Sequence, residues 1–261
     1  MRELPSEHPS SEVSRSDSVP RRDAIRIVPL YTAGEVAAPA AQLTYRKGPL
    51  LTSAEVFTLF WGAAWQEAAQ SPLVSRINAF FDFALTSPLV DQLAEYSVAG
   101  RIGHGRLTGS TIVPSQTLHT SITDMAIQAF LQREIAQGTL PQATANSLYF
   151  LYLPPGTRVV MGGSASCQAF CGYHSDISES VFYAVMPYPG CAGCLGGLTT
   201  MDALTSTSSH ELCEAITDPV AGQGWYDDAN GEIGDICAWK TKKLGQYTVQ
   251  LEWSNRAGAC V

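Results

Sequence analysis

The stretch "LTTMDALTSTSSHELCEAITDP", residues 198–219, predicts one long helix. Pro219 ends it, because the residue before a proline is pushed out of the helical conformation. Side chains four residues apart lie on the same face of a helix, so His210 and Glu214 point in one direction, with Glu211 about 100° around the axis. H-E-x-x-H zinc peptidases use this geometry: two helical ligands hold the metal, and the glutamate takes a proton from the bound water.

Glu214 stands where the second histidine of that motif is expected. A carboxylate is an acceptable zinc ligand, but it is harder than imidazole and lowers selectivity against calcium or manganese. The alternative is a polar helix face on which Ser208 and Glu211 form a capping box. Apolar residues between the acids indicate that the helix packs against a core. A histidine and two glutamates buried there are costly unless they are paired or bind a metal.

The acidic segment "GWYDDANGEIGDIC", residues 224–237, offers a further ligand. Glu232 or Asp235 is expected to complete a metal site with His210 and Glu214. The segment lacks the ligand spacing of an EF-hand. Two alternatives stay open: a calcium loop or hairpin turn at Asn230-Gly231, and hydrogen bonds that orient the helix from behind the ligands.

Two residues are candidates for assisting a reaction at this site. His174, in "CGYHSD", is interpreted as a further ligand or as a group that polarises a carbonyl. Tyr226 is interpreted as a donor to an oxyanion. The alternatives are a structural histidine in a polar turn and a tyrosine used only in packing.

Composition narrows the class of protein. The 261 residues carry 16 basic and 24 acidic side chains, a formal net charge of −8, which argues against nucleic-acid binding. No stretch approaches the roughly 20 apolar residues of a membrane span. The sequence carries no signal for an oligomeric state.

The pattern along the chain predicts an α+β fold with a mixed β-sheet rather than a regular βαβ alternation. Residues 1–46 are expected to be a disordered tail or pro-segment, and 47–261 one zincin-like domain. The elements expected in it are strands at 56–61, 146–153, 180–186 and 245–255, and helices at 73–85, 88–96, 121–138 and 198–217. The segment 101–115 is interpreted as a glycine-rich loop.

Seven cysteines lie in the C-terminal half of the chain. CxxxC at 167–171 and CxxC at 191–194 suit either disulfides or a four-thiolate zinc site, and disulfides are favoured because zinc-ribbon features are missing. The odd count leaves one thiol free or paired between chains. Disulfides imply an oxidising compartment, so an extracellular or periplasmic location is expected.

Several stretches together resemble microbial relatives of the EXORDIUM, or phosphate-induced, family. They are "KGPLLTSAEVFTLFWGAAW", "CGYHS", "YPGCAGC", "SHELCEAITDP", "GWYDDANGEIGDIC" and the terminal "ACV". The resemblance implies an extracytoplasmic, cysteine-containing single domain, and implies little about activity, since the plant members are described by growth and cell-wall phenotypes. The helix also resembles that of zincin metallopeptidases: His210 and Glu214 match the two helical ligands and Glu211 matches the general base.

The leading hypothesis is therefore a secreted, zinc-dependent metallohydrolase that acts on peptides or proteins. Zn²⁺ is expected at His210 and Glu214 with Glu232 or Asp235, with Glu211, His174 and Tyr226 as catalytic groups. Ca²⁺ is an alternative as a structural ion. The rival hypothesis is a non-catalytic EXORDIUM-like protein that binds a cell-wall component or a partner and holds a structural metal. A small-molecule biosynthetic enzyme is a third reading, because a fold does not fix a function.

Overall fold

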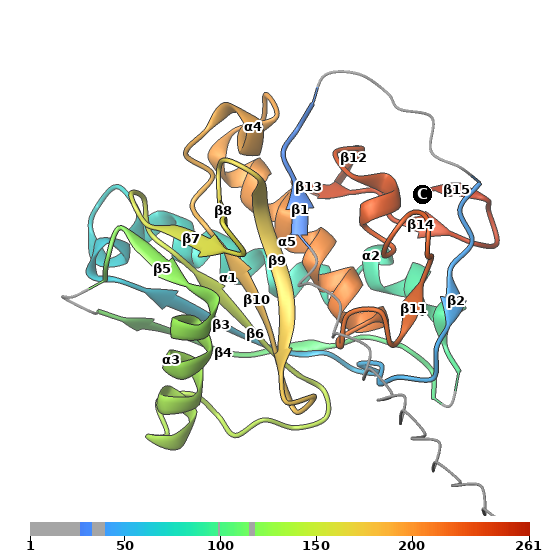
Figure 1. The fold of residues 1–261 in the computed structure, drawn as a ribbon, viewed down its shortest axis with the longest axis horizontal. Helices are drawn as coiled ribbons and strands as arrows, with labels where there is room; N and C mark the ends of the chain where they lie inside the picture. Colours follow the sequence, from blue (N-terminus) through green and yellow to red (C-terminus); the bar gives the residue numbers. More distant parts are fainter. Residues whose placement is uncertain (1–26, 33–39, 99, 115–117) are drawn as a thin grey trace, which may run out of the picture.

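The computed structural model describes residues 27–32, 40–98, 100–114 and 118–261. Its centre is a six-stranded sheet in the order β1-β9-β10-β6-β3-β4 (Figure 1). The strands of this sheet are β1 Ile27–Pro29, β3 Glu55–Trp61, β4 Arg106–Val113, β6 Ser147–Tyr152, β9 Phe170–Ile177 and β10 Val181–Met186. The expected class, a single α+β domain with a mixed sheet, is confirmed; its zincin-like character stays a prediction.

Four neighbouring strands of the sheet, β10, β6, β3 and β4, are parallel. β9 runs antiparallel to β10, and β1 runs antiparallel to β9. A helix lies between β3 and β4 in the chain, so the fold contains a parallel crossover that the sequence interpretation did not anticipate. The crossover is not expected because the sequence of β4, "RLTGSTIV", is interpreted as part of a glycine-rich loop. Gly109 allows β4 to pair closely with β3, because a Cβ there would lie 2.6 Å from the ring of Phe57.

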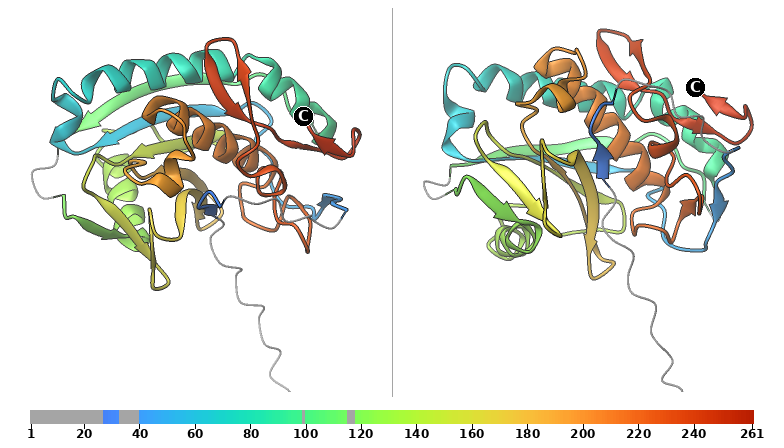
Figure 2. Two further views of the ribbon diagram at one scale, coloured as in Figure 1. Left: turned by 90° about the horizontal axis from the view of Figure 1, so that it is seen from above. Right: turned by 45° about the horizontal axis from the view of Figure 1, so that its top comes forward.

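One face of the sheet is covered by α1 Ser71–Ala84 and α5 Thr200–Thr217 (Figure 2). Phe80 and Phe81 of α1 are fully buried in this layer, and burying each such side chain contributes about 2 kcal/mol. β6 is buried at every position, since its alternate residues face the two layers: Phe150 lies in the α1/α5 layer and Leu151 in the opposite one. A continuous apolar run of this kind is typical of a central parallel strand.

The other face of the sheet packs against α3 Asp124–Ala136 and a three-stranded sheet. Phe130 of α3 stacks on Trp61 with ring centroids 3.8 Å apart. The small sheet consists of β5 Ser121–Thr123, β7 Arg158–Met161 and β8 Ser164–Ala165. The shorter helices are α2 Pro88–Asp91 and α4 Ala192–Leu195, with 3-10 turns η1 Ala63–Gln66, η2 Gln92–Tyr96 and η3 Asp235–Cys237.

The C-terminal part wraps the outer side of α5 with three two-stranded sheets (Figure 1). They pair β12 Thr241–Leu244 with β13 Tyr247–Gln250, β14 Trp253–Ser254 with β15 Ala259–Cys260, and β11 Trp225–Tyr226 with β2 Thr44–Tyr45. As a result α5 is enclosed between the main sheet and this C-terminal part, and from Ala203 to Thr217 every residue is buried.

Parts of the segment expected to be a tail form strands of the domain. Ile27–Pro29 pairs with β9, and Thr44–Tyr45 pairs with β11. Residues 1–26 and 33–39 lie outside the described residues, so the expected tail or pro-segment stays a prediction. None of the helices in the described ranges has the length and apolar character needed to span a membrane.

Disulfides account for six of the seven cysteines, which confirms the favoured interpretation over a four-thiolate zinc site. Cys167 pairs with Cys191, Cys171 with Cys194, and Cys237 with Cys260. Cys213 on α5 is a buried free thiol.

Candidate metal centre

The H-E-x-x-E segment lies in the last two turns of α5. Thr199 caps the helix by accepting a bond from the backbone N–H of Asp202. The alternative of a capping box at Ser208 is therefore wrong, because Ser208 lies in mid-helix and bonds to the Tyr152 hydroxyl at 2.7 Å. The helix ends at Asp218, the residue before Pro219, as the sequence predicts.

One group of ligand atoms joins α5 to the segment before η3. Nε2 of His210 lies 2.9 Å from Oε1 of Glu214 and 4.0 Å from Oδ1 of Asp235. The His210 and Glu214 side chains are buried, and that of Asp235 is 20% exposed. Nε2 of His210 makes no hydrogen bond, since the direction of its N–H misses Oε1 despite the short distance. We call His210, Glu214 and Asp235 the outer group.

Gly234 lets the acidic segment approach α5 at this point. A Cβ on Gly234 would lie 2.8 Å from Nδ1 of His210 and 2.9 Å from Oε1 of Glu214, both closer than real side chains allow. The backbone N–H of Asp235 also donates to Oε1 of Glu214 at 3.1 Å. The "EIGD" stretch is therefore held against the helix by its backbone as well as by its side chains.

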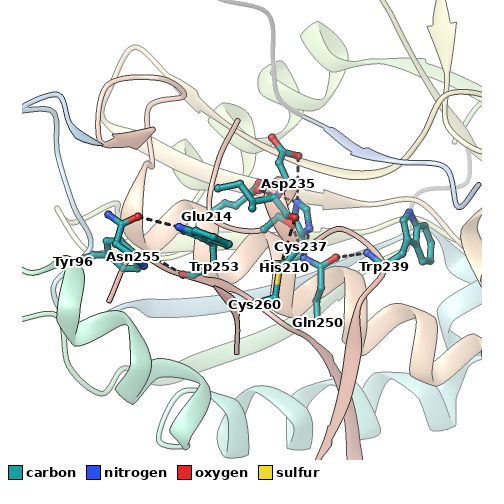
Figure 3. The surroundings of a disulfide bond; sticks show 12 residues. Tyr96, His210, Glu214, Asp235, Cys237, Trp239, Gln250, Trp253, Asn255 and Cys260 are labelled. Carbon is teal, nitrogen blue, oxygen red and sulfur yellow. Dashed lines mark hydrogen bonds and ion pairs between the residues drawn. A yellow bond between two sulfur atoms is a disulfide. The ribbon is translucent and has the colours of Figure 1, made fainter. Parts of the chain in front are cut away.

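Gln250, at the end of β13, fixes the other side of the His210 ring (Figure 3). Its Nε2 donates to the carbonyl of Gly234 at 2.9 Å and lies 2.8 Å from Nδ1 of His210. Its Oε1 accepts from the backbone N–H of Trp239 at 3.1 Å. These partners orient the amide so that Nδ1 of His210 accepts a bond and the ring carries its proton on Nε2.

A second group of ligand atoms joins α5 to β9. Nδ1 of His174 lies 3.0 Å from Oε2 of Glu211 and 3.4 Å from Oε2 of Glu214. All three side chains are buried. The expected turn around His174 is wrong, because the residue lies inside β9, where Gly172 leaves room for Thr207 and Glu211 of α5. We call His174, Glu211 and Glu214 the inner group.

Glu232 and Asp218 border the inner group. Nε2 of His174 lies 3.2 Å from the carbonyl oxygen of Asp218 and 3.5 Å from Oε1 of Glu232. Glu232 is fully buried, and neither of its carboxylate oxygens makes a hydrogen bond. Asp218 differs, since its carboxylate accepts from the backbone N–H groups of three residues: Gly222, Gln223 and Gly224.

Burial and charge shift the ionisation of these acids. Burial raises the pKa of Glu232 well above its usual range, and the neighbouring Glu214 raises it further. Burial and the charge of Glu214 raise the pKa of Asp235 to about 7. For Glu214, burial alone would raise the pKa, but the neighbouring His210 and His174 lower it to about 2. Glu214 is thus the acid of the cluster that most strongly favours its charged form.

Tyr226 lies on β11, next to this cluster in sequence but in a different setting. Its backbone carbonyl accepts from Thr44, and the guanidinium of Arg46 lies 4.5 Å from its ring centroid. Both contacts join Tyr226 to the stretch from Thr44 to Arg46. Six of the seven expected residues are brought together: His174, His210, Glu211, Glu214, Glu232 and Asp235.

Sequence reasoning missed Gln250 and Glu252. Glu252 is fully buried, and neither of its oxygens makes a hydrogen bond. Burial raises its pKa well above the usual range, with the charge of His210 acting in the opposite direction. Glu252 follows shortly after the strand "YTVQ", whose four residues are all buried. An acid this close to a buried strand is the signal in the sequence that points to this end of β13.

Comparison with known proteins gives one distant relative. No family model matches the chain. The chain is 23% identical over 235 residues to Protein EXORDIUM-like 5 of Arabidopsis thaliana, in an alignment that covers 75% of the chain and 63% of that protein. The chain thus spans less than two thirds of the length of this curated relative. The distant homology supports membership of the EXORDIUM family.

Proposed function

We propose that this chain is a non-catalytic, extracytoplasmic protein of the EXORDIUM type whose fold is completed by a structural divalent metal ion. The ligands are Nε2 of His210 and carboxylate oxygens of Glu214 and Asp235. The observation that carries the proposal is the buried Nε2 of His210, which has no hydrogen bond although two carboxylates lie beside it. A buried polar atom without a partner is costly, and an ion bound by all three groups removes that cost.

The donor set favours a transition metal. Imidazole with carboxylates suits Zn²⁺ or Mn²⁺, whereas Ca²⁺ takes six to eight oxygen ligands. Zn²⁺ is the ion we propose, in agreement with the helix pattern.

Gln250 has a specific part in this proposal. A metal-bound histidine usually donates its second ring N–H to an acceptor, which fixes the ring. The second ring nitrogen of His210, Nδ1, lies 2.8 Å from the Gln250 amide, so Gln250 would be the residue that fixes the ring while Nε2 faces the ion.

Two features favour a structural ion over a catalytic one. Oε2 of Glu211, the expected general base, lies 3.0 Å from Nδ1 of His174, so one of its two oxygens is engaged by that histidine. The side chains of His210 and Glu214 are closed off from solvent, as in structural sites, whereas a catalytic metal needs a position open to substrate. The three disulfides are compatible with an extracellular location.

Two of the tryptophans, Trp61 and Trp65, are buried, so they do not offer a ring face to a sugar. The indole N–H groups of Trp225, Trp239 and Trp253 donate to acceptors within the chain.

Metal analysis of the disulfide-bonded protein tests the proposal. We expect at least one divalent ion per chain after gel filtration, and a lower melting temperature in EDTA that returns when Zn²⁺ is added back. At an ion concentration 100 times the dissociation constant, the stabilisation is about 2.7 kcal/mol. Glu55→Gln, which changes an acid on β3, serves as a control that keeps the ion. The absence of stoichiometric metal contradicts the proposal.

The zinc-dependent peptidase is the second candidate, and the partial exposure of Asp235 favours it, because it leaves one side of the outer group near solvent. Glu211→Gln separates the two functions. If the protein hydrolyses a library of fluorogenic peptides and Glu211→Gln lowers the rate by about 100-fold or more, the site is catalytic. Under the structural proposal, wild type and variant both lack metal-dependent hydrolysis.

A further inference from the structure

The two oxygens of Glu214 face two different histidines. Oε1 lies 2.9 Å from Nε2 of His210, and Oε2 lies 3.4 Å from Nδ1 of His174. Within the outer and inner groups separately, one ligand atom from each residue lies within 4.8 Å of those of the other two. A carboxylate that belongs to both groups through different oxygens has the arrangement of a ligand that bridges two ions.

Several carboxylate oxygens in the inner part of the cluster are buried and have no partner. The carboxylates of Glu211, Glu214, Glu232 and Asp235 lie around two histidines, and three of these acids are fully enclosed. Oε1 of Glu211 and both oxygens of Glu232 make no hydrogen bond. Buried carboxylate oxygens without partners are unfavourable, and an ion held by His210, Glu214 and Asp235 leaves the free oxygen of Glu211 without a partner.

His174 is already oriented as a metal ligand. Its Nε2 lies 3.2 Å from the carbonyl oxygen of Asp218, so an N–H at that position has a backbone acceptor. This is the second contact that a metal-bound histidine usually makes, and it leaves Nδ1 to face Glu211 and Glu214. Where Nδ1 carries a proton, as in its bond to Glu211, the ring itself supplies one positive charge to the inner group.

We infer that the cluster binds two divalent ions bridged by Glu214. The second ion is held by Nδ1 of His174 and by Glu211, and it replaces the proton on Nδ1, which is released to solvent. The inference rests on the proposed ion in the outer group and adds the inner one. Bridged pairs of this kind keep their ions about 3.5–4 Å apart. Glu211 is then a ligand, which is a different role from the general base that the helix pattern predicts.

Metal titration of the metal-free, disulfide-bonded protein with Mn²⁺ or Zn²⁺ tests this inference. We expect two ions per chain by equilibrium dialysis. With Mn²⁺, the electron paramagnetic resonance spectrum should show an exchange-coupled pair, with half the hyperfine splitting of an isolated ion. Neither measurement needs a variant, so the test does not depend on a substituted chain folding.

Single substitutions assign the two ions. Glu211→Gln is expected to hold one ion, in the outer group, and Asp235→Asn one ion, in the inner group. Both lose the exchange coupling. Glu55→Gln, a control outside the cluster, keeps two coupled ions.

The outcomes separate this inference from the proposed function. One ion per chain with an uncoupled spectrum overturns the second ion and leaves the structural ion standing. Two uncoupled ions overturn the bridge, and two ions in Glu211→Gln overturn the inner group. No bound ion overturns both proposals.

Discussion

Nδ1 of His174 on β9 donates to Oε2 of Glu211 on α5 across 3.0 Å, and both side chains are closed off from solvent. Burial alone lowers the pKa of His174, but the acids around it, Glu232, Glu211 and Glu214, outweigh burial, so the pKa is raised well above 6.5. This pair ties β9, the second strand of the main sheet, to the helix that carries the proposed metal ligands.

The metal-free protein should therefore lose stability as the pH rises. A raised pKa means that the folded chain holds the proton of His174 more tightly than the unfolded chain does. The resulting stability is fully present below about pH 6.5 and is lost as the pH rises through the folded value. Urea unfolding in EDTA, measured from about pH 6 to pH 9, should show a falling free energy of unfolding.

The fall should be smaller in His174→Asn. His104→Asn, which removes an exposed histidine paired with Asp91, should behave as wild type. A wild-type stability that rises over this range contradicts the prediction.

Gly234→Ala should weaken metal binding. The added methyl group would overlap Nδ1 of His210 and Oε1 of Glu214, so the "EIGD" stretch must move away from α5. We expect at least a tenfold loss of affinity for Zn²⁺, about 1.4 kcal/mol, measured by competition with a chromogenic chelator. Gly103→Ala is the matched control, because a Cβ at Gly103 meets nothing within 4 Å. Equal affinities in the two variants would show that the close approach of Gly234 has no part in the site.

Gln250→Leu should also weaken metal binding, by a different route. The substitution removes the polar group that fixes the His210 ring, and loss of such a partner typically lowers metal affinity 10–100-fold. The same chelator competition measures it, with Gln137→Leu on the exposed end of α3 as the control. An unchanged affinity means that another group orients His210.

Removal of the Cys237–Cys260 disulfide should lower both stability and metal affinity. The bond closes a loop with a sequence separation of 23, so its loss costs about 3 kcal/mol. Cys237 lies in η3 with Asp235, so the ligand also becomes more mobile. The matched control removes Cys167–Cys191, with a separation of 24, by the same double serine substitution. The control should lose comparable stability but keep its affinity for Zn²⁺, and a loss of affinity in both would contradict the prediction.

The helix of the site could be predicted from the sequence because its signals are local. Thr199, Pro219 and the spacing of His210 and Glu214 all act within one element. The expected strands at 56–61, 146–153 and 180–186 are also confirmed, since apolar β-favouring residues run through them. The sequence offers two acids as the expected third ligand, Glu232 and Asp235. Asp235 is the one that lies in the outer group.

β9 and Gln250 could not be predicted because their roles depend on packing between distant parts of the chain. "FCGYHSDI" lacks a regular apolar alternation, since Gly172 and His174 face polar side chains of α5 rather than an apolar layer. Gln250 reaches His210 only because β13 lies along α5, 40 residues later in the chain. No periodicity within either strand reports such a contact.

The Cys237–Cys260 disulfide has a consequence for the order of assembly. Cys260 comes later in the chain than every residue of the cluster, and its bond to Cys237 closes the segment that carries Asp235. The loop that carries Asp235 is therefore closed covalently only after Cys260 has met an oxidant. An ion held as we propose would be retained most firmly after that oxidation.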